Sequence, residues 1–424
     1  MKILFKNARI LDTEKGELFN GSVEVDDNII SKVGDFEVSN SYDRIIDCKG
    51  NVLMPGFVNT HAHTPMTLLR SFKDDAPLEE WLFDNILPAE GNIMPTDVYW
   101  GEYLGILEGL RAGITTIEEG YFHNDKVYDV VEKSGIRARI GIGPTMRDVG
   151  MSNLEYLKKE ASLIKANPRI KPACFVHAIY TTSRDVIKES VEFVNKENMP
   201  LSIHLSETEK EVNDANKNYG CSPVEYLNNL GFFDRTCLAY HGVHLNQKDM
   251  EILNKKGVSV SLCMSSNLKL ASGIAPIYEL YKNGINLTIG TDGVASNNSL
   301  DMFKEMFLVA TLSKVRAGRT DVISAKDVLK MATINGAKAL GFNAGNIKEG
   351  MLADIILIDI SGAHYYPQQE LVSHLVYAGK SSDVYLTMVD GKILYEEGSF
   401  FVGEKKEKIF ENANKIREKL RKSL

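Results

Sequence analysis

Two histidines stand two residues apart shortly after an apolar run. Residues 52–58 read Val-Leu-Met-Pro-Gly-Phe-Val, and His61 and His63 follow them. In a β-strand, residues two apart point to the same face, so both imidazoles can be directed at one point. Convergent imidazoles are a typical beginning of a site for a divalent metal ion. Two histidines alone are equally compatible with hydrogen-bonded core residues, so the rest of the chain must supply further ligands and a proton carrier.

Further histidine and acidic residues occur where other short apolar runs end. His177, His204 and His241 each end such a run, Glu207 comes three residues after His204, and Asp292 follows another run. Each has an ordinary alternative when taken singly: local hydrogen bonding for a histidine, the first turn of a helix for Glu207, and a turn for Asp292. Their coincidence at so many strand ends favours one common site. The other four histidines follow no such pattern and are expected to be structural: His123, His244, His364 and His374.

The middle of the chain alternates short apolar runs with helical patterns. The runs expected to form strands are 53–59, 115–118, 138–143, 173–177, 201–204, 237–241, 258–263 and 287–291. Helices are expected between them, one with Thr96 as its N-cap and an end before Gly113, and others over 246–256 and 299–316. This alternation is typical of an α/β (β/α)8 barrel, the TIM barrel, whose active sites lie at the C-terminal ends of the strands. The polar strand-end residues would then share one mouth.

Both ends of the chain have a different texture, with short alternating segments and frequent turns. Segments 3–11, 22–25 and 29–33 are predicted strands, and Asp390-Gly391 is a strong hairpin signal near the other end. We therefore expect a small β-sandwich domain built from both termini. The expected boundaries are 1–55 and 345–424 for the two parts of this domain and 56–344 for the barrel, with a surface helix from about 405 to 424.

The composition of the 424 residues is that of an ordinary globular protein, with 44% hydrophobic and 25% charged residues. A net charge of −8 argues against a nucleic-acid-binding surface, and no apolar stretch approaches the length of a membrane span. Lys6 and Arg9 interrupt the N-terminal apolar residues too early for a signal peptide. The five cysteines form no CxxC pair and are odd in number, and Cys174, Cys237 and Cys263 lie in apolar runs. Free thiols suit a reducing compartment, so we expect a cytoplasmic protein.

The histidine and acidic residues at the predicted strand ends belong to longer motifs that resemble the amidohydrolase superfamily. The motifs are 55–63, His204 with Glu207, 241–244 and 290–293. The resemblance spans nearly the whole chain and is closest to the branch that deaminates 5′-methylthioadenosine, S-adenosylhomocysteine and related adenosines. The segments similar to that branch are 63–70, 78–82, 87–90, 266–273 and 292–298.

The resemblance implies a metal site in which His61, His63, His204 and Asp292 bind one divalent ion. That ion would be zinc, or iron as in some relatives, and the histidine and carboxylate ligands suit zinc. Relatives with two metals place a carboxylated lysine at the end of the fourth barrel strand. Here residues 175–177 read Phe-Val-His at that end, which favours a single metal.

The resemblance also implies the roles of a hydrolytic deaminase. Asp292 would take a proton from the attacking water, whose pKa zinc lowers to about 7. Glu207 would protonate the purine nitrogen beside the attacked carbon, and His241 would hold the attacking oxygen. This division requires a protonated Glu207 and an ionised Asp292. The residues implied in substrate binding are Trp81, Glu90, Arg147, His177, Glu207 and Asp292.

Some of these substrate contacts have simpler alternatives. Trp81 would form a wall of the pocket, and His177 would contact the purine edge. Glu90 would accept hydrogen bonds from ribose hydroxyls, since a carboxylate suits a vicinal diol, but a solvated loop acid is an alternative. Arg147 would lie near the ribose or its 5′ group, and a surface ion pair is the alternative.

The sequence therefore predicts a metal-dependent deaminase of a small nucleoside. It would convert S-adenosylhomocysteine, 5′-methylthioadenosine, 5′-deoxyadenosine or adenosine into the inosine analogue and ammonia. The alternative is an aminohydrolase or chlorohydrolase of the same superfamily that acts on guanine, cytosine or an s-triazine, with the same metal ligands and a different pocket. A metal-free binding or assembly protein is disfavoured because every ligand position is filled. Relatives of this class often self-associate, so a homo-oligomer is compatible with the resemblance.

Overall fold

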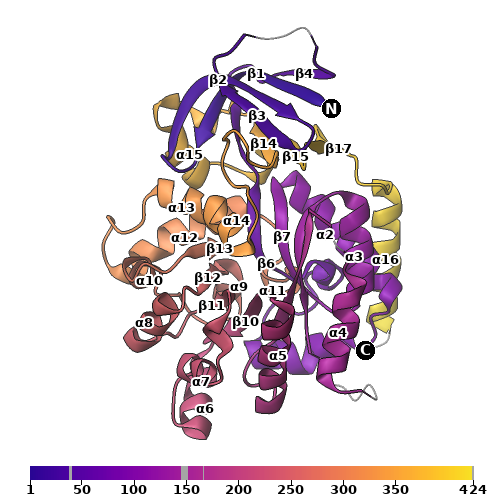
Figure 1. Ribbon diagram of the computed structural model, residues 1–424, viewed down its shortest axis with the longest axis vertical. Helices are drawn as coiled ribbons and strands as arrows, with labels where there is room; N and C mark the ends of the chain where they lie inside the picture. The colour runs from indigo at the N-terminus through magenta and orange to yellow at the C-terminus, as the bar shows by residue number, and fades with distance from the viewer. Residues whose placement is uncertain (38–40, 145–150, 166, 423–424) are drawn as a thin grey trace.

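A barrel and a separate sheet make up the molecule. The computed structural model describes residues 1–37, 41–144, 151–165 and 167–422. Figure 1 shows the barrel strands with helices around them and, above, a sheet formed by the two ends of the chain.

Eight parallel strands follow one another in chain order around the barrel, from β6 to β13. They are β6 (Phe57–Ala62), β7 (Ile114–Gly120), β8 (Arg137–Ile142), β9 (Ile170–Val176), β10 (Leu201–Leu205), β11 (Cys237–His241), β12 (Ser259–Leu262) and β13 (Leu287–Ile289). Each predicted run contributes one of these strands, so the predicted (β/α)8 barrel is confirmed.

The predicted strand 53–59 is wrong in one respect, because the chain changes sheet at Gly56. The residues before it form β5 (Val52–Pro55), which pairs antiparallel with β14 (Ile355–Ile358) in the other sheet. The N–H group of Gly56 still donates to the carbonyl oxygen of Asp354 in that sheet, at 3.0 Å, and the first barrel strand begins at Phe57. A continuous apolar run carries no sign of such a change of partner.

The first and last strands of the barrel lie side by side and close it. The side-chain amide of Asn59 donates to Oγ1 of Thr291 at 2.7 Å. The backbone N–H group of Asp292 donates to the carbonyl oxygen of His61 at 2.8 Å. We call this junction of β6 and β13 the seam, and two of the predicted metal ligands lie on it.

The predicted N-cap at Thr96 is wrong by two residues. The helix α2 (Pro95–Arg111) has Met94 as its N-cap, and the carboxylate of Asp97 accepts a hydrogen bond from the backbone N–H group of Met94 at 2.9 Å. Proline is favoured at the first helical position because its φ is already helical and its missing N–H group would have no partner there.

Helices and short helical turns connect the barrel strands. The remaining helices are α1 (Leu87–Glu90), α3 (Asn124–Ser134), α4 (Asn153–Leu163), α5 (Arg184–Glu197), α6 (Glu209–Tyr219), α7 (Pro223–Asn229), α8 (Gln247–Lys255), α9 (Met264–Lys269), α10 (Ile277–Lys282), α11 (Val294–Asn297), α12 (Met302–Ala317), α13 (Ala325–Ala332), α14 (Ile334–Leu340), α15 (Leu371–Tyr377) and α16 (Lys406–Lys422), with a π-helix η2 (Glu80–Ile86).

The second sheet is built from both termini, which confirms the predicted β-rich domain. Its strands are hydrogen-bonded in one nine-stranded sheet of order β17-β16-β15-β14-β5-β1-β2-β3, with β4 beside β1. Side chains from both ends of the chain share one apolar core, among them Phe5, Ile355 and Met388. The strands not yet given are β1 (Lys2–Asp12), β2 (Glu17–Asp26), β3 (Ile29–Gly34), β4 (Arg44–Asp47), β15 (Val384–Val389), β16 (Lys392–Glu396) and β17 (Ser399–Phe400).

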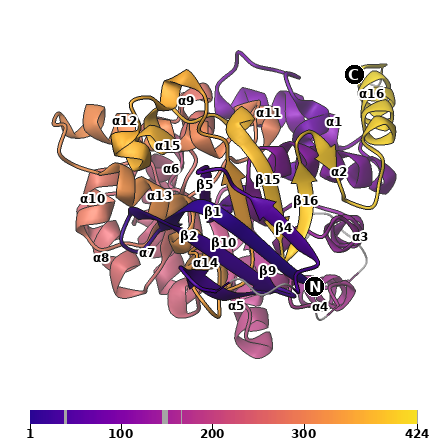
Figure 2. The same cartoon turned by 90° about the horizontal axis from the view of Figure 1, so that it is seen from above.

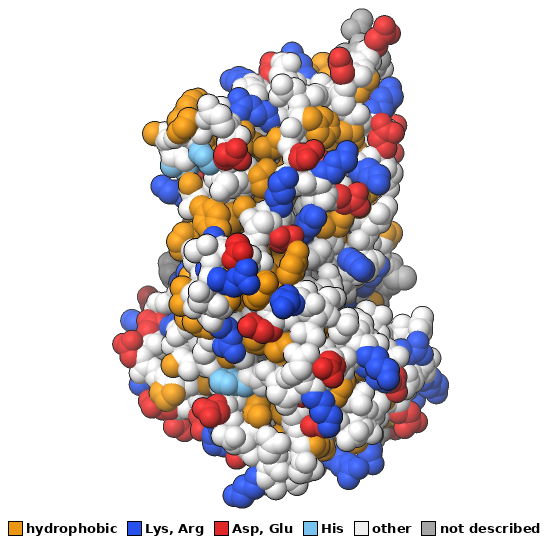
Figure 3. All heavy atoms as spheres, turned by 90° about the vertical axis from the view of Figure 1, so that its left-hand side faces the viewer, with side chains coloured by type: hydrophobic (Ala, Val, Ile, Leu, Met, Phe, Trp, Pro, Cys, Tyr) orange, Lys and Arg blue, Asp and Glu red, His pale blue; other side chains and the backbone are white. Residues whose placement is uncertain are grey.

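The surface carries the features expected from the composition. The predicted C-terminal helix is α16, and Figure 2 shows it beside α2 on the outside of the barrel. On the face shown in Figure 3, basic and acidic side chains are interspersed. Within the described part of the chain, no helix is long and apolar enough to cross a membrane. All five cysteines are free, and Cys174, Cys237 and Cys263 are buried as predicted.

Candidate active site

Ligand atoms that suit a metal ion converge at the seam. Nε2 of His61 lies 3.3 Å from Oδ1 of Asp292, and Nε2 of His63 lies 3.5 Å from the same oxygen. The ligand atoms of His61, His63 and Asp292 all lie within 4.8 Å of one another, as do those of His61, His204 and His241. All of these residues are buried. The structure therefore brings together the four residues predicted to bind metal, and places His241 beside them. We call His61, His63, His204 and Asp292 the metal-ligand group.

Backbone carbonyl groups orient two of these imidazoles. Nδ1 of His63 donates to the carbonyl oxygen of Gly120, and Nδ1 of His204 donates to that of His177 at 2.8 Å. A carbonyl oxygen only accepts, so each proton sits on Nδ1 and each Nε2 keeps its lone pair for a ligand. Nε2 of His61 is buried and has no hydrogen-bond partner among the described residues. Such a nitrogen destabilises the fold unless something binds it, so this donor set fits a divalent metal ion.

Burial keeps the imidazoles at the mouth neutral. It lowers the pKa of His61 to about 3 and the pKa of His177 to about 4. It also lowers the pKa of His63, His204 and His241. The neutral form is the one that binds a metal ion.

Asp292 is buried and ionised. Burial alone would raise its pKa, but the imidazole of His61, whose Nε2 lies 3.3 Å from Oδ1, and those of His241 and His63 hold that pKa well below the usual value. Its Oδ2 accepts hydrogen bonds from the hydroxyl groups of Ser266 at 2.5 Å and Ser296 at 3.0 Å, and its Oδ1 accepts one from the N–H group of Gly293 at 2.7 Å. The φ of +61° at Asp292 lies in the left-handed region, which is uncommon for a residue other than glycine. Such strain at a strand end is typical of a functional position.

Glu207 is equally buried but has the opposite charge preference. Burial, and to a smaller extent the charge of Asp292, raise the pKa of Glu207 to about 8, so its carboxyl group is protonated near neutral pH. Its Oε2 lies 3.7 Å from Nε2 of His241. Glu207 precedes Thr208, the N-cap of α6, so it is not a first-turn helix acid. A buried, protonated carboxyl group beside a metal-ligand group can act as a proton donor.

Glu211, for which no role was predicted, supports the backbone of Glu207. Its carboxyl oxygens accept hydrogen bonds from the N–H groups of Ser206 at 3.1 Å and Glu207 at 2.8 Å. Ser206 has a left-handed φ of +49°. In the sequence alone, an acid in the first turn of a helix is explained by the helix dipole, so nothing distinguished Glu211 from other such acids.

A cavity of about 50 Å³ lies over the metal-ligand group. Trp81 in η2 and His177, both predicted to contact substrate, are part of its wall. Nε1 of Trp81 is buried and has no hydrogen-bond partner in the described part of the chain, so it can donate to a ligand. The lining residues are His63, Met66, Leu78, Trp81, Leu82, His177, Tyr180, His204, Glu207, His241, Leu270 and Asp292. The apolar members were missed because nothing in the sequence separates an apolar pocket wall from core.

Two predicted substrate contacts do not line this cavity. Glu90 accepts a hydrogen bond from the hydroxyl group of Tyr121 at 2.7 Å, and burial raises the pKa of Glu90 to about 7. Glu90 lies in the short helix α1 and is partly exposed, so both its predicted ribose contact and the solvated alternative stay predictions. Tyr121 directly follows Gly120, whose carbonyl oxygen orients His63, so Glu90 is close to the supports of the metal-ligand group. Arg147 lies outside the described residues.

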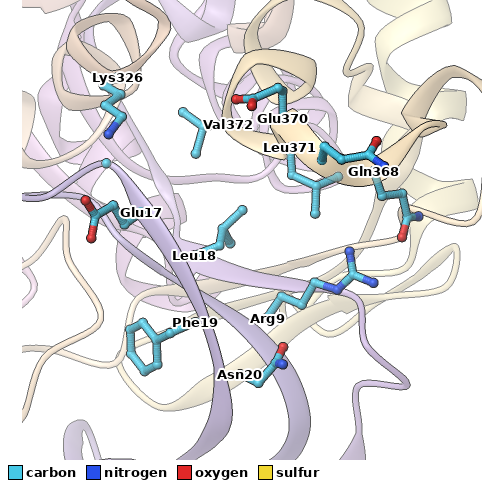
Figure 4. A pocket seen from close by; sticks show the side chains of 12 residues that line it. Arg9, Glu17, Leu18, Phe19, Asn20, Lys326, Gln368, Glu370, Leu371 and Val372 are labelled. Carbon is cyan, nitrogen blue, oxygen red and sulfur yellow. The ribbon is translucent and has the colours of Figure 1, made fainter.

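A larger hollow and His364 lie apart from this site. Figure 4 shows a hollow of about 490 Å³ that shares no lining residue with the cavity; Arg9, Glu17, Lys326 and Glu370 are among its walls, and its lining residues include neither histidine nor cysteine. His364 pairs with Asp383 at 3.0 Å, away from the residues of the cavity.

A family model gives the same picture as the geometry. The model of the amidohydrolase family matches residues 52–394. This chain belongs to the amidohydrolase family. The match includes all barrel strands and every residue of the metal-ligand group.

Similar proteins of this family carry deaminase names. A 5′-deoxyadenosine deaminase of Methanosarcina barkeri is 41% identical over 99% of this chain and 98% of its own length. A 5-methylthioadenosine/S-adenosylhomocysteine deaminase of Acetivibrio thermocellus is 43% identical over 93% of this chain and 94% of its own length. Among solved structures, an adenosine deaminase from Xanthomonas campestris with bound zinc is similar with a TM-score of 0.93 and 33% identity, covering 99% of this chain and 98% of that one.

Proposed function

We propose that this amidohydrolase is a metal-dependent deaminase of an adenosine derivative. The substrate is S-adenosylhomocysteine, 5′-methylthioadenosine, 5′-deoxyadenosine or adenosine, and the products are the inosine analogue and ammonia. The names of the similar proteins support this proposal. The observation that carries it is the protonated, buried carboxyl group of Glu207 beside ionised Asp292, since hydrolytic deamination needs both an acid and a base.

The proposed metal is one Zn²⁺ ion per chain, with Fe²⁺ as the alternative. His61, His63, His204 and Asp292 would hold it. Neutral imidazoles and a carboxylate are ligands that suit zinc, and the similar structure from Xanthomonas campestris has zinc bound. When bound, such an ion supplies Lewis acidity, which lowers the pKa of a water molecule to about 7.

Two side chains would carry protons, and a third would hold the attacking oxygen. Asp292 accepts a proton from the water that attacks C6 of the purine, while Glu207 donates its proton to the neighbouring ring nitrogen and so prevents negative charge from building up on the ring. The N–H group of His241 donates a hydrogen bond to the attacking oxygen. The C6–N bond then breaks, the amino group leaves as ammonia with the proton from Asp292, and the second proton of the water returns to Glu207.

The rest of the substrate requires more room than the cavity offers. A volume of about 50 Å³ holds one or two water molecules, whereas small-molecule pockets typically measure about 300–1,000 Å³. A hollow of about 350 Å³ adjoins the cavity and shares Leu78, Leu82 and Tyr180 with it. These shared side chains must move when a nucleoside binds. We propose that Trp81 and His177 then contact the purine, Glu90 the ribose hydroxyls, and Arg147 the ribose or its 5′ group.

A substrate panel tests the proposed function. The metal-loaded protein is incubated with the four adenosine derivatives, guanine, cytosine and an s-triazine, and ammonia release is followed. We expect turnover of at least one adenosine derivative, loss of that turnover after the metal is removed with a chelator, and recovery after zinc is added back. Turnover of guanine, cytosine or the triazine alone would favour the other aminohydrolases and chlorohydrolases of the superfamily.

Two properties of the proposed enzyme concern its surroundings. All five cysteines are free thiols, which suit a reducing compartment and support a cytoplasmic location. A homo-oligomer stays a prediction that gel filtration with light scattering can test.

A further inference from the structure

One segment, residues 266–272, contacts all three side chains that the proposed reaction uses to handle protons. It begins within α9 and continues into the following loop. The hydroxyl group of Ser266 donates to Oδ2 of Asp292 at 2.5 Å. The side-chain amide of Asn267 lies 3.0 Å from Nδ1 of His241, and the hydroxyl group of Ser272 donates to Oε1 of Glu207 at 3.3 Å.

The three contacting residues of this segment are buried, and the segment is tied to its surroundings. Ser266 and Asn267 are 0% exposed, and Ser272 is 6% exposed. At the beginning of α9, the N–H group of Ser265 donates to the carboxylate of Glu305 at 3.1 Å. After α9, the carbonyl oxygen of Ser272 accepts a hydrogen bond from Nε2 of His244 at 2.8 Å. The backbone is thus fixed at both ends of the segment, so its side chains can hold their partners in place.

A lysine of the same segment joins it to the loop that carries Asp292. Nζ of Lys269 donates to the carbonyl oxygen of Ala295 at 3.1 Å, to Oδ1 of Asn298 at 2.6 Å and to Oδ1 of Asp74 at 2.7 Å. The positions of the segment and of Asp292 are therefore coupled through both Ser266 and Lys269.

The amide of Asn267 faces His241 with its nitrogen, and this orientation constrains which nitrogen of His241 carries the proton. With the Asn267 amide N–H as donor, Nδ1 of His241 accepts, so the single proton of the neutral ring sits on Nε2. Nε2 lies 3.7 Å from Oε2 of Glu207, inside the cavity. The group His61, His204 and His241 is compact enough to bind a metal ion, but a protonated Nε2 has no lone pair for one. This tautomer makes His241 a hydrogen-bond donor instead of a metal ligand.

We propose that Ser266, Asn267 and Ser272 are positioning residues for Asp292, His241 and Glu207, and that Asn267 keeps His241 as a donor to the attacking oxygen. The proposal rests on the proposed deaminase function, because that function gives Asp292, His241 and Glu207 their roles in the reaction. The arrangement of the three contacts and the tautomer of His241 can be tested without any substrate.

The tautomer of His241 is the first test. The zinc-loaded protein is labelled with ¹⁵N-histidine, and the signals of His241 are assigned from those lost in His241→Gln. We expect an unprotonated Nδ1 and a protonated Nε2, and loss of this fixed pattern in Asn267→Leu. A protonated Nδ1, with Nε2 bound to the metal, would overturn the proposal.

Kinetics of matched variants are the second test. We expect Asn267→Asp, which is nearly the same size but reverses the direction of the hydrogen bond, to lower kcat about 100-fold, with Ser272→Ala lowering it about 10-fold. KM and metal content should stay within about twofold in both. The control is Ser265→Ala, in the same helix, because its hydroxyl group is buried without a partner among the described residues. A wild-type kcat in Asn267→Asp, or equal losses in Ser265→Ala, would contradict the positioning role.

The two tests separate the failure of this proposal from the failure of the proposed function. If the wild-type protein releases no ammonia from any adenosine derivative, the proposed function is wrong, and the tautomer of His241 still decides the role of Asn267. If the wild-type protein is active and the tautomer is reversed, only the positioning role is wrong.

Discussion

Two carboxyl groups at the barrel mouth are equally buried, yet their charge states are opposite. The pKa of Asp292 lies well below its usual value, and that of Glu207 is raised to about 8. The difference lies in their neighbours. The imidazoles of His61, His241 and His63 lower the pKa of Asp292, His61 most strongly. The charge of Asp292 raises the pKa of Glu207, and the hydrogen bond from Ser272 does not offset this. Burial raises the pKa of both groups, and their neighbours decide whether that effect is offset.

This comparison has a chemical consequence. An ionised and a protonated carboxyl group stand at the same mouth. One scaffold can therefore offer an acid and a base from the same residue class, through the neighbours placed around each carboxyl group.

The largest effect on metal content and activity is expected from a change at Asp292. Asp292→Asn removes a negative ligand and the proposed proton acceptor together. We expect metal content near zero after dialysis and a loss of turnover of about 10⁴-fold or more, because the contributions of metal and base are both lost. Metal analysis and ammonia release measure this. Asp185→Asn, an exposed acid on α5, is the control and should keep both. Full metal content in Asp292→Asn would show that Asp292 is not a ligand.

Glu207→Gln should distinguish the role of Glu207 from that of Asp292. Glutamine has nearly the same size but cannot donate a proton as an acid, so we expect turnover to fall by about 10²–10⁴-fold. Metal content should stay near one ion per chain because Glu207 is not a ligand. Nearly normal activity in this variant would make the proton-donor role wrong.

The pH dependence tests the raised pKa of Glu207 directly. The proposed mechanism requires the protonated form, and a pKa of about 8 means that this form is lost as the pH rises through that value. We expect kcat/KM to decrease above about pH 8 with a single ionisation, and this decrease to be absent from the residual activity of Glu207→Gln. A decrease that persists unchanged in the variant would assign the ionisation to another group.

The smallest effect, on metal affinity, is expected from removing one hydrogen-bond donor to Asp292. Ser296→Ala removes one hydroxyl donor and leaves Ser266 and Gly293 in place. Partners of this kind typically contribute 10–100-fold to metal affinity, and we expect about 10-fold here, measured by competition with a chelator. Ser313→Ala is the control, since the hydroxyl group of Ser313 donates to Ala310 within α12. Unchanged affinity in Ser296→Ala would mean that the remaining donors suffice.

The sequence predicted the parts of this molecule that follow from periodicity and chain order. Buried barrel strands are short apolar runs, and the ends of parallel strands meet at one mouth, so His61, His204 and Asp292 could be placed together from the sequence alone. The change of sheet at Gly56 was not predictable, because residues 52–58 form one apolar run and only the hydrogen-bond partners differ.

The supports of the site were hidden for another reason. A histidine at a strand end has few roles, but a serine, an asparagine or a helix acid has many. Ser266, Asn267, Ser272 and Glu211 acquire their meaning only from which side chains the fold places within hydrogen-bond distance. The sequence therefore showed the reacting groups more clearly than the residues that hold them.

The seam gives the metal a second consequence, for folding. Asn59 and Thr291, 232 residues apart in the chain, meet there, and beside them the backbone N–H group of Asp292 bonds to His61. An ion held by His61, His63 and Asp292 would cross-link the first and last strands of the barrel. It would close a very long loop, and its binding free energy would then add to the free energy of unfolding. The ion proposed for catalysis would therefore also stabilise the contact between the first and last barrel strands.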